Sequence, residues 1–334
     1  MRVRHKPLAD QVIVITGASS GIGLATARTA ASLGARVMLA SRNEAALADI
    51  CHDIQERGGE ARHVVADVSS RQDLETLAAE TIRAYGSFDT WVNNAGFTIF
   101  GRIEDVPDAD HRRLFDVNFW GVVNGSLVAA QHFKAHGGAL INLGSVASDI
   151  AIPLQGIYAA SKHAIKGFTD AFRMELESEC APISVTLIKP ASIDTPITAH
   201  AGNYMGHAAQ LPPPVYHPQD VANAIVRAAE HGDRDVYIGG GGKLMSSLNK
   251  RVPSVMDKVG ANFMPQAQIA RGPVVDPEGA LYNPGQGGQV RGSSPHHVMR
   301  SLYTPASTHT AMSGALLVGF GLAAAAALSR SQRS

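Results

Sequence analysis

The chain has 334 residues, of which 45% are hydrophobic and 17% charged, and its formal net charge at pH 7 is zero. This length is enough for one large buried core or two modest ones. A neutral, weakly charged chain lacks the electrostatic field that gathers nucleic acid, so we expect no nucleic-acid partner. Its two cysteines are too few for a disulfide framework, and together with a short apolar N-terminal run they predict a cytoplasmic protein.

Short apolar runs alternate with helical patterns up to about residue 240. Strands are expected at 12–16, 36–40, 63–66, 90–93, 139–143, 183–188 and 236–238, and helices at 21–33, 43–57, 71–85, 108–135, 157–179 and 218–231. Apolar strands separated by helices are typical of right-handed βαβ units and of a parallel sheet covered on both faces. We predict an α/β fold, a doubly wound parallel sheet of the Rossmann type, in a single catalytic domain over residues 1–245.

The pattern changes after residue 245. Residues 246–270 predict a helical extension, 271–310 have the Gly/Pro-rich composition of a linker, and 311–334 form an apolar C-terminal segment. Within it, MSGALLVGFGLAAAAAL at 312–328 has about the minimum length that spans a bilayer and is only weakly hydrophobic. Two interpretations remain open: association with a membrane through 312–328, or a helix that packs on the protein.

A glycine motif, TGASSGIG at 16–23, follows the first expected strand and opens a helix. Its glycines, Gly17, Gly21 and Gly23, permit a tight turn and a close backbone approach to a pyrophosphate. Ile22 lies in the first turn of the helix, whose free N–H groups and positive dipole end favour phosphate. Ser19 and Ser20 are further phosphate donors, or plain helix caps. Strand before and helix after are the context that makes this a dinucleotide motif.

The end of the second strand predicts which dinucleotide binds. An NAD site has an acidic residue there for the ribose hydroxyls, but this chain reads ASRN at 40–43. Arg42 offers a planar fork to a 2′-phosphate, with Ser41 and Asn43 as hydrogen-bonding neighbours. The sequence therefore predicts NADP (NADPH) as the cofactor.

Further motifs, in the same order, resemble those of the short-chain dehydrogenase/reductase family over residues 8–240. TGASSGIG resembles its phosphate loop, NNAG at 93–96 the segment beneath the cofactor, and VNFWG, LGSV and YAASK its catalytic motifs. The resemblance implies an adenine site at Asp67 and Val68, and cofactor contacts at Asn94, Ala95 and Gly96. It also places Pro190, Ile193 and Thr195 around the nicotinamide, although Ala191 stands where the family usually has glycine.

The resemblance further implies a catalytic set of four residues, which are Asn118, Ser145, Tyr158 and Lys162. Helical spacing puts Lys162 on the same face as Tyr158, and a cation there is expected to lower the pKa of the phenol. Ser145 would hold the substrate oxygen, and Asn118 would hold a water that contacts Lys162. Such a set transfers hydride between nicotinamide and a carbonyl or secondary alcohol, an oxidoreductase acting on CH–OH groups.

The substrate is predicted from the irregular segment 191–217, which we expect to act as a mobile flap. No arginine or lysine lies between Lys189 and Arg227, so the sequence favours an apolar ketone or aldehyde over an anion. Expected pocket walls are Ile99, Phe100, Ile150, Ile152, Leu154, Tyr204 and Met205. The histidines have no metal-binding spacing, so no metal site is expected.

Two alternatives to the reductase remain. One is a dinucleotide-binding scaffold or regulator that acts through the C-terminal extension. The other is a non-redox relative, an epimerase or dehydratase, which Arg42 disfavours because such enzymes use a tightly held NAD. The family resemblance also implies a homodimer that pairs through the helices at 108–135 and 157–179.

Overall fold

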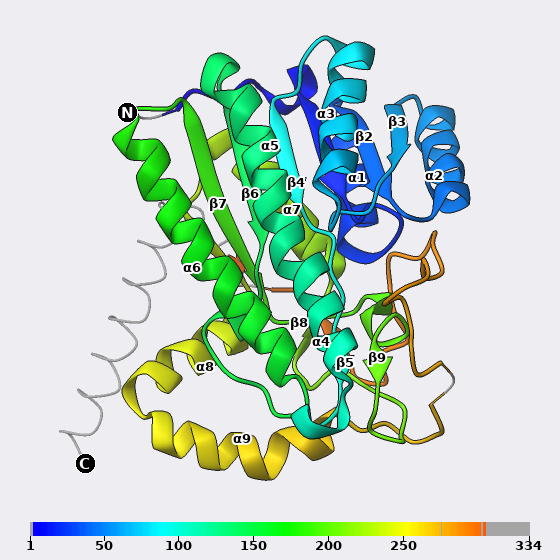
Figure 1. Ribbon diagram of the computed structural model, residues 1–334, viewed down its shortest axis with the longest axis vertical. Coiled ribbons are helices and arrows are strands. Elements are labelled where there is room, and N and C mark those ends of the chain that lie inside the picture. The colour runs from blue at the N-terminus through cyan, green and yellow to red at the C-terminus, as the bar shows by residue number, and fades with distance from the viewer. Residues whose placement is uncertain (1–2, 275, 302, 305–334) are drawn as a thin grey trace, which may run out of the picture.

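The computed structural model describes residues 3–274, 276–301 and 303–304. Its centre is a parallel sheet with the strand order β11-β7-β6-β4-β1-β2-β3 (Figure 1). These strands are β1 (Val12–Thr16), β2 (Arg36–Ser41), β3 (Glu60–Val65), β4 (Thr90–Asn93), β6 (Gly138–Leu143), β7 (Ile183–Pro190) and β11 (Asp235–Ile238). The order reverses direction beside β1, and in such sheets ligands bind at that point, outside the carboxyl ends of the strands. The predicted doubly wound sheet is confirmed.

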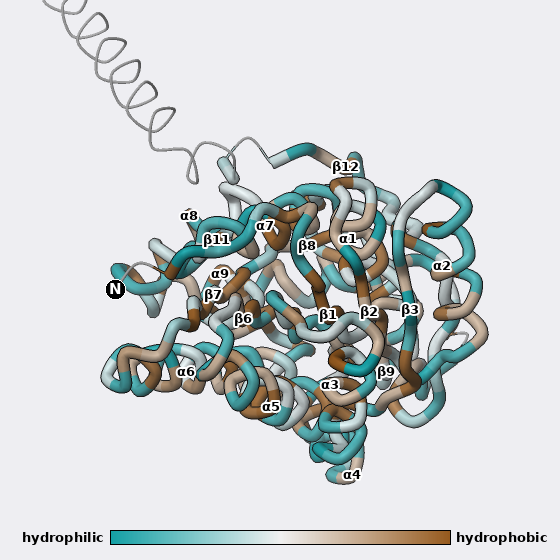
Figure 2. The backbone as a smooth tube through the Cα atoms, turned by 90° about the horizontal axis from the view of Figure 1, so that it is seen from above, coloured by the Kyte–Doolittle hydropathy of each residue, from teal (hydrophilic) through white to brown (hydrophobic). Residues whose placement is uncertain are grey.

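Helices cover both faces of this sheet (Figure 2). One face carries α1 (Gly21–Ser32), α2 (Glu44–Glu56) and α7 (Pro218–His231), and the other carries α3 (Arg71–Tyr85), α4 (Asp108–Phe115), α5 (Gly121–His136) and α6 (Gly156–Ser178). Each face has its own cluster of buried apolar side chains. The middle strands β1, β4 and β6 are buried throughout, because both of their faces are covered.

The helix expected at 108–135 is interrupted. Between α4 and α5 the chain makes a π-helical turn, Asp116–Trp120. Such turns insert an extra residue into a helix and re-aim the side chains around it, often at functional sites. Asn118 lies in this turn and is completely buried, which the sequence pattern did not indicate.

Two helices follow the last strand of the main sheet, α8 (Gly240–Arg251) and α9 (Pro253–Gln268). Short strands hold the segment expected to be a flap: β5 (Ile99–Phe100) pairs with β9 (Gly202–Asn203), and β8 (Ser192–Ile193) and β12 (Val298–Met299) flank β10 (Val215–Tyr216). The segment between β7 and α7 is therefore pinned at several points rather than free along its length.

The central part of the segment predicted to be a linker, 271–310, packs against the rest of the protein. Residues 276–301 return to the body of the protein, as the orange segment of Figure 1 shows beside β9 and below α2. Backbone hydrogen bonds cause this return, among them Gly288 N–H to Ser19 O at 2.8 Å and Asn203 N–H to Pro277 O at 2.8 Å. Composition misleads here because glycine and proline, which are typical of linkers, also permit a backbone to lie closely against another one.

The apolar run at 312–328 lies outside the described residues. Among the residues that are described, no helix has both the length and the apolar character needed to cross a membrane.

Candidate active site and cofactor crevice

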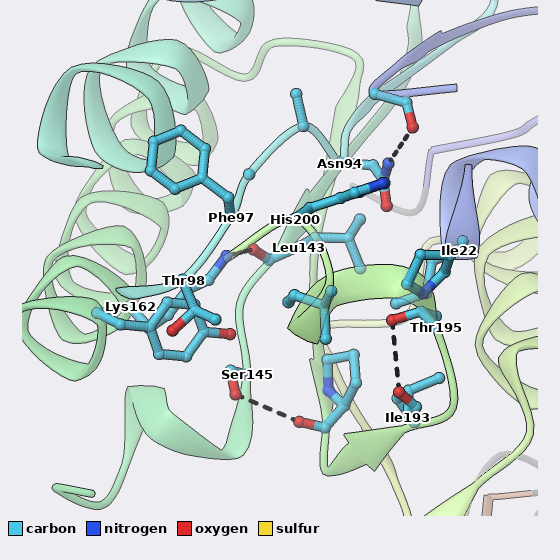
Figure 3. Close-up of a pocket in the computed structure, with 18 of the residues that line it drawn as sticks. Ile22, Asn94, Phe97, Thr98, Leu143, Ser145, Lys162, Ile193, Thr195 and His200 are labelled. Carbon is cyan, nitrogen blue, oxygen red and sulfur yellow. Dashed lines mark hydrogen bonds between the residues drawn. The ribbon is translucent and has the colours of Figure 1, made fainter. Parts of the chain in front are cut away.

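One cavity lies at the carboxyl ends of β1, β2, β4, β6 and β7. Nearly all of the predicted site residues line it; Gly23 and Asn118 lie just behind the lining. Those that line it are Gly17, Ser19, Ser20, Gly21, Ile22, Ser41, Arg42, Asn43, Asp67, Val68, Asn94, Ala95, Gly96, Ser145, Tyr158, Lys162, Pro190, Ile193 and Thr195. Figure 3 shows Ser145, Lys162 and Thr98 on one side of this cavity, with Ile22, Ile193 and Thr195 across from them.

The glycine loop is fixed in place by the segment after β4. The Asn94 side chain donates to the backbone oxygens of Thr16 and Gly17 at 2.9 and 3.1 Å, and the Thr16 hydroxyl accepts from the N–H groups of Asn94 and Ala95. The N-terminal turn of α1 then faces the cavity with Gly21 and Ile22, and its N-cap residue, Ser20, makes no side-chain capping bond. A preorganised loop with a twelve-residue helix behind it fits a pyrophosphate group.

At the β2 and β3 end of the cavity, charged groups already pair with each other. The Asp67 carboxylate accepts from Arg113 at 2.6 Å and from the Ser69 hydroxyl at 2.7 Å. Burial alone would raise the pKa of Asp67, but these two hydrogen bonds outweigh it and hold the pKa below its usual value. Asp67 is therefore a fixed anion beside the expected adenine position.

Arg42 points toward the same end, but its partners come from far along the chain. Its Nη1 donates to the backbone oxygens of Leu281 and Tyr282 at 3.2 and 3.0 Å, and its Nη2 to those of Ala280 and Asn283. Asn43 donates from Nδ2 to Gly285 O at 2.9 Å. The residues predicted to bind a 2′-phosphate thus hold the C-terminal extension in this structure.

Tyr158 and Ser145 meet at the opposite end of the cavity. Tyr158 comes from the first turn of α6, and Ser145 caps the short helix Val146–Ser148 that follows β6, where its hydroxyl accepts from Ala147 N–H at 3.0 Å. The Ser145 hydroxyl donates to Pro190 O at 3.4 Å, and both residues line the cavity. Burial raises the pKa of Tyr158, and the neighbouring Ser145 hydroxyl offsets only part of this rise.

Lys162 lies one turn further along α6, on the same side as Tyr158. Its Nζ is 5.7 Å from the centre of the Tyr158 ring and donates to Leu143 O at 2.9 Å. The expectation that the lysine lowers the pKa of the phenol is not met, because burial dominates at both groups. Burial lowers the pKa of Lys162 from 10.5 to about 8 and raises that of Tyr158, so the phenol is kept protonated.

Asn118 clamps the chain just in front of Lys162. Its Oδ1 accepts from Phe97 N–H at 3.0 Å, and its Nδ2 donates to Phe97 O at 2.9 Å and to the Ser161 hydroxyl at 3.3 Å. A Cβ atom added to Gly96 would lie 3.0 Å from Asn118 Oδ1 and 3.9 Å from Lys162 Nζ. Asn118 therefore fixes the backbone at Gly96 and Phe97, which line the cavity next to Lys162.

The walls at the Tyr158 end differ from those expected. Ile150 and Ile152 line the cavity, together with Val146, Leu211, Met245 and Met264. Ile99 and Phe100, which form β5, are instead buried outside the cavity lining. The Tyr204 hydroxyl binds Asp110, away from the cavity. Leu154 and Met205 are also missing from the lining that the described residues form. The methionines of α8 and α9 had no sequence signal, because helical periodicity does not say what a helix covers.

The family model described as short chain dehydrogenase matches residues 11–205, which is more than half of the chain. The chain belongs to the short-chain dehydrogenase family. The match contains the glycine loop and the Ser145, Tyr158 and Lys162 cluster, and it ends before α8, α9 and the returning segment.

Three relatives of this family member are informative. An uncharacterized oxidoreductase, YxnA, of Bacillus subtilis is 44% identical over 97% of this chain and 93% of its own length. An 11-beta-hydroxysteroid dehydrogenase A of Sesamum indicum is 34% identical over 69% of this chain and 68% of its own. The solved structure of an alcohol dehydrogenase from Thermococcus sibiricus, complexed with 5-hydroxy-NADP, is 26% identical, covers 68% of this chain and 95% of its own, and has a TM-score of 0.60. The chain is an oxidoreductase whose crevice suits a nicotinamide dinucleotide.

Proposed function

We propose that this family member is an NADP(H)-dependent carbonyl reductase that acts on an apolar ketone or aldehyde, and on the corresponding secondary alcohol in reverse. The observation that carries the proposal is the meeting of Ser145, Tyr158 and Lys162 at one end of a cavity whose other end is a glycine loop. A dinucleotide that extends along this cavity has its reactive ring beside the two hydroxyls.

The bound nicotinamide supplies or accepts the hydride. Ser145 and Tyr158 both face the position of the substrate oxygen, and their hydroxyls stabilise the negative charge that develops on it. The raised pKa of Tyr158 keeps a proton available at neutral pH, which suits donation to that oxygen during reduction. The Lys162 ammonium stabilises the phenolate left behind, and Asn118 holds the backbone at Phe97, next to the lysine.

Asn118, by the same proposal, also supports a water that passes a proton to Lys162. Thr195 and Ile193 hold the carboxamide of the nicotinamide at the end of β8, where the Thr195 hydroxyl already donates to Ile193 O at 3.4 Å. Asp67 and Val68 contact the adenine. These roles follow from the family resemblance together with the positions of the residues at the cavity.

An apolar substrate is supported by the lining at the Tyr158 end. The described lining residues with a formal charge are Arg42, Asp67 and Lys162, and the walls at this end include methionine, isoleucine, leucine, valine and proline beside the uncharged polar residues Thr98 and Gln155. The name of the sesame relative, a hydroxysteroid dehydrogenase, agrees with this class. Oxidation of NADPH should therefore proceed with cyclic and aromatic ketones and not with their carboxylated analogues. Cofactor binding without turnover of any carbonyl would instead favour the scaffold alternative.

Cofactor choice is tested by Arg42→Ala. A guanidinium that binds a phosphate contributes about 1.5–3 kcal/mol per charged hydrogen bond, so we expect the Kd for NADPH to rise at least about tenfold and that for NADH to change little. Titration of the purified protein with each cofactor measures both. Arg83→Ala, at a side chain that is 78% exposed on α3, is the control and should alter neither. Equal losses for the two cofactors would contradict the assignment.

The activity should also depend on pH through Lys162. Its folded pKa of about 8 lies below the usual value, so the ammonium is present below pH 8 and is lost as the pH rises through 8. We expect kcat/KM for reduction to be level below pH 8 and to fall by about tenfold per pH unit above it. In Lys162→Arg the charge persists, so this fall near pH 8 should vanish from the profile, whatever the absolute rate. A wild-type profile that stays level up to pH 10 would refute this role for the lysine.

We also propose a homodimer that pairs through α4, α5 and α6. Trp120, the last residue of the π-helical turn before α5, and Met174, on α6, leave 50% and 61% of their surfaces exposed in the single chain, as large apolar side chains at an interface would. The mass in solution tests this, and a stable monomer of 35.1 kDa would exclude it. Membrane association through 312–328 remains a proposal about residues that the structure does not describe.

A further inference from the structure

The strap, defined as residues 279–292, lies along the outer side of the cofactor crevice. Ala280, Pro284 and Gly285 form part of the cavity wall, next to Arg42 and Asn43. The strap lies beyond residue 205, where the match to the family model ends.

The strap is bonded to the glycine loop by its backbone. Gly288 N–H donates to Ser19 O at 2.8 Å, and Gly21 N–H donates to Gln289 O at 2.8 Å. A Cβ atom on Gly287 would lie 2.2 Å from the Cβ of Ala46, so only glycine allows this approach. The strap is thus fitted to the loop that would cradle the pyrophosphate.

Each end of the strap has its own anchor. At one end the side chain of Leu281 is completely buried in the core, and the Tyr282 hydroxyl donates to Asp110 at 2.6 Å. At the other end Arg291 pairs with the buried Asp194 at 2.8 Å. The two anchors lie over different parts of the crevice, the first beside Arg42 and the second beyond the glycine loop.

The turn at 280–283 accepts hydrogen bonds from the guanidinium of Arg42. A guanidinium has five N–H donors, four of them on the two terminal nitrogens. Both terminal nitrogens of Arg42 donate to this turn, through four contacts with consecutive carbonyl oxygens. A phosphate that binds in the bidentate manner needs at least one of these terminal nitrogens, so it must displace carbonyl oxygens of the turn.

We propose that the strap sets the cofactor preference by competing with the 2′-phosphate for Arg42. NAD(H), which has no such phosphate, binds under a closed strap and leaves the turn in place. NADP(H) binds Arg42 only after the turn releases it, so the closed strap lowers the affinity for NADP(H) selectively. The inference rests on the proposed role of Arg42 in binding NADP(H).

The proposal is tested by loosening one end of the strap at a time. Leu281→Ala removes the buried anchor beside Arg42; it should tighten NADPH by about fivefold or more and alter NADH by less than about twofold. Arg291→Ala loosens the end beyond the glycine loop, where the two cofactors do not differ, so any effect should be the same for both. If Leu281→Ala does not fold, Tyr282→Phe loosens the same turn through its bond to Asp110.

A double mutant isolates Arg42. In Leu281→Ala/Arg42→Ala the gain in NADPH affinity should disappear, because the turn and the 2′-phosphate no longer have a guanidinium to compete for. The strap proposal is overturned if Leu281→Ala and Tyr282→Phe shift both cofactors equally, or weaken NADPH. If Arg42→Ala weakens NADPH binding in the wild-type background while the strap variants affect NADPH and NADH equally, only the strap proposal is wrong. If Arg42→Ala leaves the Kd for NADPH unchanged in both backgrounds, the proposed preference for NADP(H) is wrong as well.

Hydrogen exchange in the wild-type protein gives a second, independent reading. The amide of Ala280 donates to His200 O at 2.9 Å while the strap is closed. NADP⁺ should speed exchange in peptides that cover 279–285, and NAD⁺ should slow it. Slowing by both cofactors to the same extent would mean a simple cover without selectivity, and would contradict the competition.

Discussion

Tyr158→Phe should abolish turnover while NADPH still binds. The substitution removes only the phenolic oxygen, which lines the cavity beside Ser145 and is the proton donor in the proposed reduction. General acid catalysis contributes about 100- to 10,000-fold, so kcat should fall by at least that factor. The Kd for NADPH should change by less than about threefold, because the glycine loop and Arg42 lie at the other end of the cavity.

Tyr85→Phe is the matched control for this experiment. Its hydroxyl donates to Val37 O at 3.4 Å at the end of α3, outside the cavity lining. The control should keep wild-type kcat. If Tyr158→Phe retained a substantial fraction of the activity, Tyr158 would not be the proton donor, and the proposed mechanism of carbonyl reduction would be wrong.

The main sheet could be predicted because its causes are local, and so could the gathering of most candidate site residues along one of its edges. Alternating apolar runs and helical periods give the strands and helices to within a few residues, and parallel strands bring their carboxyl ends to one edge. That edge collects Gly17, Asn94, Ser145 and Pro190 from four separate strands. The order of the motifs along the chain is therefore sufficient to predict that these residues lie at the same edge of the sheet.

The ionisation of Tyr158 could not be predicted in the same way. Spacing places Lys162 on the correct face, but it does not give the depth at which both groups are buried. In the structure, burial raises the pKa of the phenol and lowers that of the lysine, and the 5.7 Å between Nζ and the ring does not reverse either shift. Burial is a property of the assembled fold, so sequence spacing alone misjudged the balance.

The strap is the larger omission, and its cause is long-range. Arg42 and its carbonyl partners are separated by about 240 residues, and their contacts use backbone oxygens, which every residue type supplies. No composition rule marks such a partner. The arginine itself could be recognised as a cation at the cofactor end, but the group that occupies it could not.

Gly23→Ala should lower both the stability and the cofactor affinity, because Gly23, in the first turn of α1, lies directly against the backbone of the glycine loop. A Cβ atom there would lie 2.2 Å from Gly17 O and 2.6 Å from Asn94 Nδ2. The alanine must push the loop away from the segment that fixes it, and overpacking of this kind costs about 1–3 kcal/mol. We therefore expect a lower midpoint in urea unfolding and a Kd for NADPH that rises at least about tenfold.

Gly167→Ala separates this steric effect from the general effect of adding a methyl group to a helix. Gly167 lies inside α6, is exposed, and has no neighbouring atom within 4 Å of an added Cβ. Alanine is the better helix former, so this variant should gain about 0.5–1 kcal/mol in its free energy of unfolding and bind NADPH as the wild type does. If Gly23→Ala behaved like Gly167→Ala, the close contact between α1 and the glycine loop would not be what positions the pyrophosphate, and the loop would have to bind the cofactor in a more open conformation.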